Sequence, residues 1–285
     1  MEWFSYILEH PERPWKWVAI SANPNITWDI VREHPECPWD WGTLSSNPNI
    51  TWNIVEANPE KPWNFEALSM HPNITWDIVK ANPDKPWSYP HLSSNPNITW
   101  DIVKENYEEP WDFCELSANP NITWKIVREN SHEEWDYAML SMNPSISWKT
   151  IQKNPHRFTC HIGISRNPNI TWDIVMKHPF RTWCFTEMKA ITWEILEKYP
   201  EIEYERGLLC PLDYIEKHQS EGGIYTNASE NPNITWEYVE ANKNKRWNYS
   251  RLSGNTMPLL KETRQRVQAR TQLFKNELNE CCAYV

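Results

Sequence analysis

The sequence repeats itself every 24 residues, and this period limits the folds open to the chain more than any other feature. One tryptophan, preceded by Ile-Thr or Ile-Ser, marks the period. It occurs at Trp28, Trp52, Trp76, Trp100, Trp124, Trp148 and Trp172. A second tryptophan, usually preceded by proline, occurs at Trp39, Trp63, Trp87, Trp111 and Trp135. A fixed period of this length indicates a repeat array in which neighbouring units bury each other's apolar faces.

Each unit is predicted to contain two short helical segments. The first begins after a threonine such as Thr27, whose hydroxyl can cap free backbone N–H groups. It ends by His34, because Pro35 disfavours helical geometry in the residue before it. The second is predicted to open with Pro38 at its first helical position, where the missing N–H costs nothing. This segment is short enough to be either α or 3₁₀.

Helices of one or two turns are unstable alone, so stacking on neighbours has to stabilise them. The chain has 20 tryptophans among its 285 residues. Each can bury about 150–250 Å², or roughly 4–6 kcal/mol before entropy is counted. We therefore expect an all-α solenoid of about ten to eleven two-helix repeats, with both tryptophan series in its structural core and without a central globular core.

The repeats extend over residues 1–256, with two irregular parts. Residues 1–22 form a degenerate first unit, because terminal units expose one face to water. The period is weakest over residues 200–230, where Leu212 takes a tryptophan position. Residues 257–285 change pattern: Leu260, Val267, Phe274 and Cys281 recur every seven residues. This spacing predicts one amphipathic helix that caps the last repeat.

Charge is distributed unevenly along the chain. The formal net charge is −10, yet residues 243–285 contain nine Lys/Arg and three Glu, a balance of +6 that leaves −16 for residues 1–242. The acidic body argues against nucleic-acid binding through the repeats. The C-terminal helix offers a basic face made of Lys261, Arg264, Arg266, Arg270 and Lys275. Nucleic acid, an anionic membrane, or the acidic body of another copy in self-assembly are alternative partners for it.

Several motifs are candidates for chemistry. Cys160 and His161 lie near His156 and Cys184, but a zinc site needs four converging ligands, and Cys160 and His161 are direct neighbours. Asn-Ile-Thr sequences, as at Asn25 and Asn49, are formal glycosylation acceptors, which we interpret as corners followed by helix caps. Seven cysteines without a Cys-x-x-Cys pair indicate free thiols. Neither a signal peptide nor an apolar run long enough to span a membrane is evident.

No catalytic set stands out, and no cofactor or metal is expected. Paired carboxylates such as Glu108–Glu109 are typical of solvated surface. The alternative is an enzyme or metal protein that uses residues 200–230 or the Cys160/His161 cluster.

The phrases Asn-Pro-Asn-Ile-Thr-Trp-Asp-Ile-Val and Asn-Pro-x-Lys-Pro-Trp resemble the tryptophan-rich repeat proteins of large DNA viruses that infect amoebae. The resemblance covers roughly residues 1–256. It implies a protein of the virion, such as a minor or internal capsid component, or of the infected host cytoplasm, and not a secreted one. The repeat length is also similar to the leucine-rich variant repeat, a solenoid of alternating α and 3₁₀ helices, although tryptophan stands where that repeat prefers Leu or Pro.

These observations predict a non-enzymatic scaffold for protein–protein interaction. A constant core with variable surface positions provides an extended binding face. The variable positions include Arg32–Glu33, Glu66–Ala67, Pro90–His91 and Cys114–Glu115. The resemblance implies a viral structural protein or a host protein as the partner.

Overall fold

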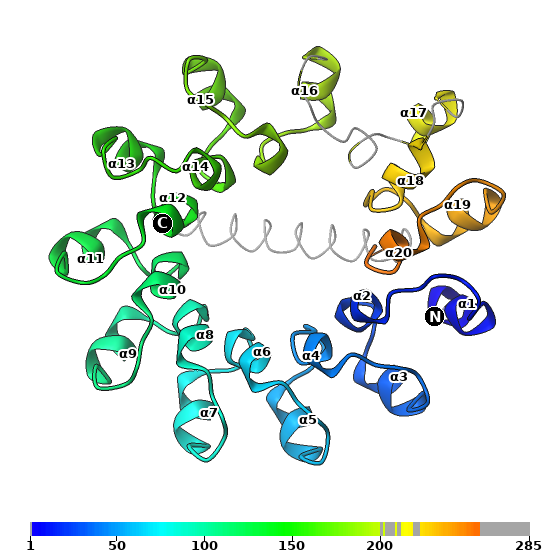
Figure 1. The fold of residues 1–285 in the computed structure, drawn as a ribbon, viewed down its shortest axis with the longest axis horizontal. Helices are drawn as coiled ribbons and strands as arrows, with labels where there is room; N and C mark the ends of the chain where they lie inside the picture. The colour runs from blue at the N-terminus through cyan, green and yellow to red at the C-terminus, as the bar shows by residue number, and fades with distance from the viewer. Residues whose placement is uncertain (1, 200–201, 203–208, 210–211, 219–222, 257–285) are drawn as a thin grey trace, which may run out of the picture. The chain divides into compact units, whose positions relative to one another are not determined.

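The structure, a computed structural model, describes residues 2–199, 202, 209, 212–218 and 223–256. These residues form twenty short α-helices and one 3₁₀ helix, and none of them lies in a strand. The regular succession of short helices confirms the all-α solenoid (Figure 1). The chain divides into two compact units, Trp17–Tyr204 and Met1–Lys16 with Glu205–Val285. The predicted capping helix at 257–285 lies outside the described residues.

Helices of the unit Trp17–Tyr204 alternate between two layers (Figure 1). The outer layer contains α3 (Trp28–Glu33), α5 (Trp52–Ala57), α7 (Trp76–Ala81), α9 (Trp100–Glu105), α11 (Trp124–Glu129), α13 (Trp148–Lys153), α15 (Trp172–Lys177) and α16 (Trp193–Lys198). The inner layer contains α2 (Trp17–Ala22), α4 (Trp41–Leu44), α6 (Phe65–Met70), α8 (Tyr89–Ser94), α10 (Phe113–Ala118), α12 (Tyr137–Met142), α14 (His161–Arg166) and the 3₁₀ helix η1 (Phe185–Glu187). Successive inner helices from α6 to α14 pack directly on one another.

The outer helices begin and end where the sequence predicts. In α3 the Thr27 hydroxyl accepts a hydrogen bond from the backbone N–H of Ile30 at 3.4 Å. His34, the residue before proline, is the C-terminal cap. The same threonine cap occurs at Thr75, Thr99, Thr123 and Thr171. A threonine cap before the helix and, as in α3, a proline after it therefore set the length of the outer helices.

The inner helices begin later than predicted, so the assignment of Pro38 to the first helical position is wrong. Helix α4 begins at Trp41, and the carboxylate of Asp40 caps it by accepting the N–H of Thr43 at 2.8 Å. Residues 37–39 form a tight turn instead. The backbone N–H of Trp39 donates to the Cys37 carbonyl at 2.8 Å. The proline stiffens this turn, and a polar side chain two residues later starts the helix.

Tryptophan rings link consecutive repeats. Trp28 packs on Trp63 with ring centroids 5.7 Å apart, and Trp100 packs on Trp135 at 5.8 Å. All the tryptophans of the predicted core are buried or half-buried. The most deeply buried apolar side chains are nevertheless mostly aliphatic: Ile26, Ile50, Ile74, Ile98, Ile122, Ile146 and Ile170 are each at most 2% exposed. The indoles thus flank an aliphatic layer.

A ladder of buried asparagines, which the sequence did not reveal, joins most of the regular repeats to the preceding one. The side-chain amide of Asn47, 1% exposed, donates to the carbonyls of Ser21 at 2.8 Å and Asn23 at 2.9 Å. The same bonds recur at Asn95, Asn119, Asn143, Asn167 and Asn255. Every rung satisfies buried backbone carbonyls that would otherwise destabilise the interior.

Buried serines form a second ladder beside the asparagines. The hydroxyl of Ser21 accepts the backbone N–H of Asp40 in the next repeat at 2.9 Å. The hydroxyl of Ser45 accepts the N–H of Asn64 and donates to the carbonyl of Trp41 at 2.7 Å. These bonds place each inner-helix cap against the preceding repeat.

The other unit contains α1 (Glu2–Glu9), α17 (Leu212–Lys217), α18 (Ile224–Ala228), α19 (Trp236–Ala241) and α20 (Tyr249–Leu252). Its N-terminal segment packs on the last repeat with the contacts used between neighbouring repeats. Trp15 lies edge-on to Tyr249 at 5.2 Å, and the backbone N–H of Lys16 donates to the Ser253 hydroxyl at 3.1 Å. The expectation that the first unit turns this face to water is therefore wrong, because the last repeat covers it.

Candidate interaction surface

A surface crevice recurs at one register of the outer layer, between an outer helix and the loop after the next outer helix. Crevice A lies between α3 and residues 58–61 and has a volume of about 280 Å³. Crevice B lies between α13 and residues 177–181, with about 380 Å³. Crevice C lies between α15 and the two residues Tyr199 and Ile202, with about 500 Å³. Equivalent tryptophans, Trp28, Trp148 and Trp172, form one wall of each.

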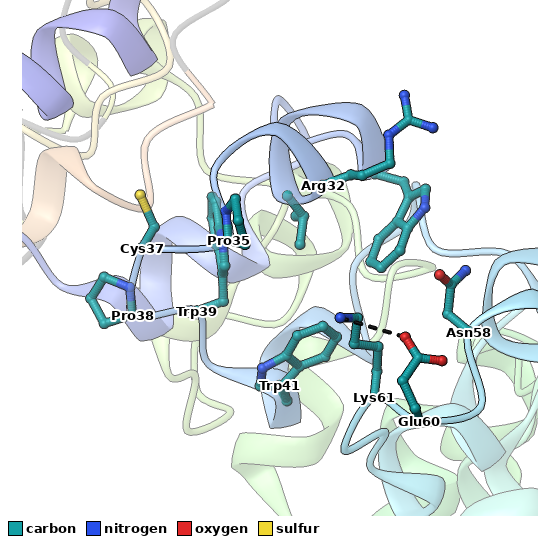
Figure 2. Close-up of a pocket in the computed structure, with 11 residues that line it drawn as sticks. Arg32, Pro35, Cys37, Pro38, Trp39, Trp41, Asn58, Glu60 and Lys61 are labelled. Carbon is teal, nitrogen blue, oxygen red and sulfur yellow. Dashed lines mark ion pairs between the residues drawn. The ribbon is translucent and has the colours of Figure 1, made fainter.

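The charges of crevice A are paired within the chain (Figure 2). The Lys61 ammonium lies 3.5 Å from the Glu60 carboxylate and 6.0 Å from the centre of the Trp41 ring. Arg32 is bound to Asp29 at 2.8 Å. Each of these two cations therefore already has an anion within the chain.

Crevice B contains a cation without a counter-charge. The guanidinium carbon of Arg181 lies 5.4 Å from the centre of the Trp148 ring and 5.8 Å from that of Trp183. Its Nε atom is buried and has no hydrogen-bond partner. Burial lowers the pKa of the Arg181 guanidinium from its usual value, yet the group stays protonated because arginine does not lose its proton in proteins. No carboxylate among the described residues pairs with it.

An aromatic side chain projects beside this arginine. Phe180 is 102% exposed, the highest value among the exposed large apolar side chains of the described residues. It occupies the register that Glu60 occupies in crevice A, while Gln152 replaces Arg32. Crevice B thus combines a cation with an exposed aromatic ring.

Crevice C is apolar. Its lining includes Met176, Tyr199 and Ile202, and Met176 is 48% exposed. Pro179 lines both crevice B and crevice C. The two crevices therefore form neighbouring parts of one surface, cationic in one part and apolar in the other.

The residues that the sequence suggested for chemistry have ordinary structural positions. The Cys160 thiol accepts the backbone N–H of Gly163 at 3.3 Å, so it caps helix α14. The next residue, His161, is exposed. No group of His, Cys, Asp and Glu within the described part of the chain is arranged to hold a metal ion.

The predicted variable positions do not form one face. Arg32 and Glu33 lie on the outer helix α3, whereas Glu66–Ala67, Pro90–His91 and Cys114–Glu115 lie on inner helices. The sequence missed the crevices because their linings come from residues one repeat apart. A signal was nevertheless present: Met176 and Phe180 are apolar where the equivalent positions of the other regular repeats are mostly charged or polar.

Asparagines of the Asn-Ile-Thr motifs take part in the interior bonding. The amide of Asn49 donates to the carbonyls of Pro24 at 2.7 Å and Ile26 at 2.8 Å. Asn97, Asn121 and Asn169 make the equivalent bonds. These amides stabilise the corners between repeats, in line with the structural interpretation of the motif.

The predicted basic face, from Lys261 to Lys275, lies outside the described residues, as does part of region 200–230. Where the structure is described, no helix is both long and apolar enough to cross a membrane. Comparisons of the chain with protein-family models, curated proteins and solved structures found no match, so the crevices are characterised by their own residues alone.

Proposed function

We propose that this chain is a non-enzymatic scaffold that binds proteins through the crevices of its outer layer. The observation that supports the proposal is the recurrence of one crevice with different linings. Equivalent tryptophans wall all three crevices, while the lining is charged in crevice A and apolar in crevice C. A repeated wall sets the spacing of the sites, and a variable lining gives each its own specificity.

The resemblance of the repeat phrases extends the proposal to a location. We propose a viral structural protein or a host protein of the infected cytoplasm as the partner, with the chain acting in the virion as a minor or internal capsid component or in that cytoplasm. Detection of the chain in purified virions by proteomics would distinguish these two places.

Affinity capture with the full chain tests the scaffold function. We expect a partner captured in stoichiometric amount by the wild type and lost or reduced in one of three crevice variants, Lys61→Glu, Phe180→Ser or Met176→Ser. The control is Glu66→Gln on the inner helix α6, which should capture as the wild type does. Absence of any stoichiometric partner, or equal capture by every crevice variant, would contradict the proposal.

A second candidate is nucleic-acid binding through residues 257–285. It is favoured by the charge of +6 over residues 243–285, set against −16 over residues 1–242. Removal of residues 257–285 should then abolish a binding that weakens steeply with salt. Binding that persists after this removal would exclude the tail as the site.

A further inference from the structure

We propose that crevice B binds an acidic peptide segment of a partner protein, with a carboxylate against Arg181 and an apolar side chain against Phe180. This inference rests on the proposed scaffold function and names the chemistry of one partner. Its basis is the combination, in one crevice of about 380 Å³, of an unpaired arginine, an exposed aromatic ring and a local excess of positive charge.

Arg181 is prepared for an anion. The ring centres of Trp148 and Trp183 lie 5.4 and 5.8 Å from its guanidinium carbon. Because these rings already restrict the side chain, binding would cost less of its conformational entropy. Its Nε has no acceptor in the free chain, and an unsatisfied buried donor is costly. A carboxylate can accept from a guanidinium through both oxygens. An acidic side chain on the accessible part of the guanidinium would therefore supply the counter-charge that the described residues do not provide.

Phe180 supplies the apolar contact. At the equivalent positions the other regular repeats carry Glu36, Glu60, Asp84, Glu108, His132 and His156. A fully exposed ring contributes nothing to the interior, and burial of an aromatic ring at a contact is among the strongest contributions to protein binding. Met176 and Pro179 continue the apolar surface toward crevice C.

The surrounding charge favours an acidic segment. Residues 148–181 contain six Lys/Arg and one Asp, in a chain whose formal net charge is −10. Lys149 and Lys153 on α13 and Lys177 on α15 are exposed, and no ion pair joins any of them to the described residues. Attraction between this region and an acidic segment would speed association and select against basic partners.

A protein segment fits better than a nucleic acid. Single-stranded nucleic acids follow an extended basic groove with several stacking rings, whereas crevice B offers one arginine and one exposed ring. The strongly acidic remainder of the body would also repel a long polyanion. A short segment with a few carboxylates and one or two apolar side chains matches both the size and the charge of the crevice.

Fluorescence polarisation with the full chain tests the inference. The probe is a fluorescein-labelled peptide, Asp-Glu-Glu-Leu-Phe-Glu-Asp. We expect saturable one-to-one binding that weakens as salt is raised. Arg181→Met and Phe180→Ser should each weaken it by about tenfold or more. A peptide with Asn and Gln in place of Asp and Glu should bind at least about tenfold more weakly, because it cannot form the charged pair.

The matched control is Lys61→Met, the same register in crevice A, which should change the affinity by less than about twofold. Thermal unfolding should show that Phe180→Ser and Arg181→Met keep the wild-type fold. The inference is overturned by equal binding of the amide peptide, by an equal effect of Lys61→Met, by a lack of saturable binding, or by tighter binding of a single-stranded oligonucleotide. Self-association that is lost in Phe180→Ser and unaffected by the probe would also overturn it, in favour of a second copy.

Two outcomes separate this inference from the scaffold function. If the probe fails while partner capture persists in Phe180→Ser, the scaffold stands and the acidic ligand is wrong. If the probe binds as expected but no partner is captured, crevice B has the proposed chemistry and the scaffold function is wrong.

Discussion

Crevices A and B share an equivalent tryptophan wall, Trp28 in one and Trp148 in the other, and differ in the rest of their linings. In crevice A, Lys61 is paired with Glu60 across 3.5 Å. In crevice B, Phe180 replaces the glutamate and Arg181 has no counter-charge among the described residues. An exposed ion pair contributes only about 0–1 kcal/mol, so the lining can change with little loss of stability. The walls, in contrast, belong to the packed interior, which suggests that stability and recognition reside in separate residues.

The largest expected effect is at the tryptophan position of the repeat that forms one wall of each crevice. Trp100 is the equivalent of Trp28 and Trp148 in a repeat that lies between them in the chain. Its ring packs on Trp135 at 5.8 Å and on Phe113 at 6.5 Å. Trp100→Ala should lower the free energy of unfolding by about 3–5 kcal/mol, because it leaves a cavity between repeats. Urea unfolding followed by circular dichroism measures it. A loss below ~1 kcal/mol would mean that the wall does not stabilise the fold.

The asparagine ladder beneath the walls comes next. Asn119 is buried and donates to the carbonyls of Ser93 at 2.8 Å and Asn95 at 2.9 Å. Asn119→Leu keeps a similar volume and leaves these carbonyls unsatisfied, which should cost about 2–3 kcal/mol. The control is Asn121→Ser, since Ser145 occupies the same position one repeat later and bonds the Pro120 carbonyl. Equal losses in the two variants would contradict a special role for the ladder.

Removal of the cation should change the free energy of unfolding in different directions in crevice B and crevice A. Arg181→Met removes a buried unsatisfied Nε and keeps an apolar stem against Trp148, so stability should stay equal or rise by up to about 1 kcal/mol. Lys61→Met removes the pair with Glu60 and should lower stability by less than about 1 kcal/mol. Urea unfolding of both variants measures the difference. Destabilisation by Arg181→Met beyond ~1 kcal/mol would show that this arginine is structural.

The smallest effect concerns the thiol of crevice A. Burial, and then the charge of Glu36, raise the pKa of Cys37. The thiol is therefore mostly protonated at pH 8, and its alkylation by iodoacetamide should be slower than that of free cysteine and should accelerate as the pH rises. Peptide mass spectrometry measures the rate, and Glu36→Gln should increase it slightly. The acidic probe should leave the rate unchanged if it occupies crevice B, whereas protection of Cys37 would place it in crevice A.

The sequence alone determined the features that depend on a few neighbouring residues. The threonine caps, the helix ends before proline and the succession of short helices all follow from contacts within about one helical turn. The same reasoning failed at Pro38, because Asp40 caps the inner helix while its backbone N–H also bonds Ser21 of the preceding repeat. Local sequence rules allow a helix to begin either at Pro38 or after an Asp40 cap, so they do not determine which start occurs.

Only the tertiary structure decided the asparagine ladder, the crevices and the covering of the first unit. The Asn47 amide bonds residues 24 and 26 positions earlier, and Lys16 bonds Ser253 across 237 positions. The crevice linings likewise combine residues of two repeats. Periodicity states which residues are equivalent, but the geometry of stacking determines which of them meet. Stacking also placed aliphatic side chains at the centre of the interior, with the buried or half-buried indoles beside them, where some indoles form crevice walls.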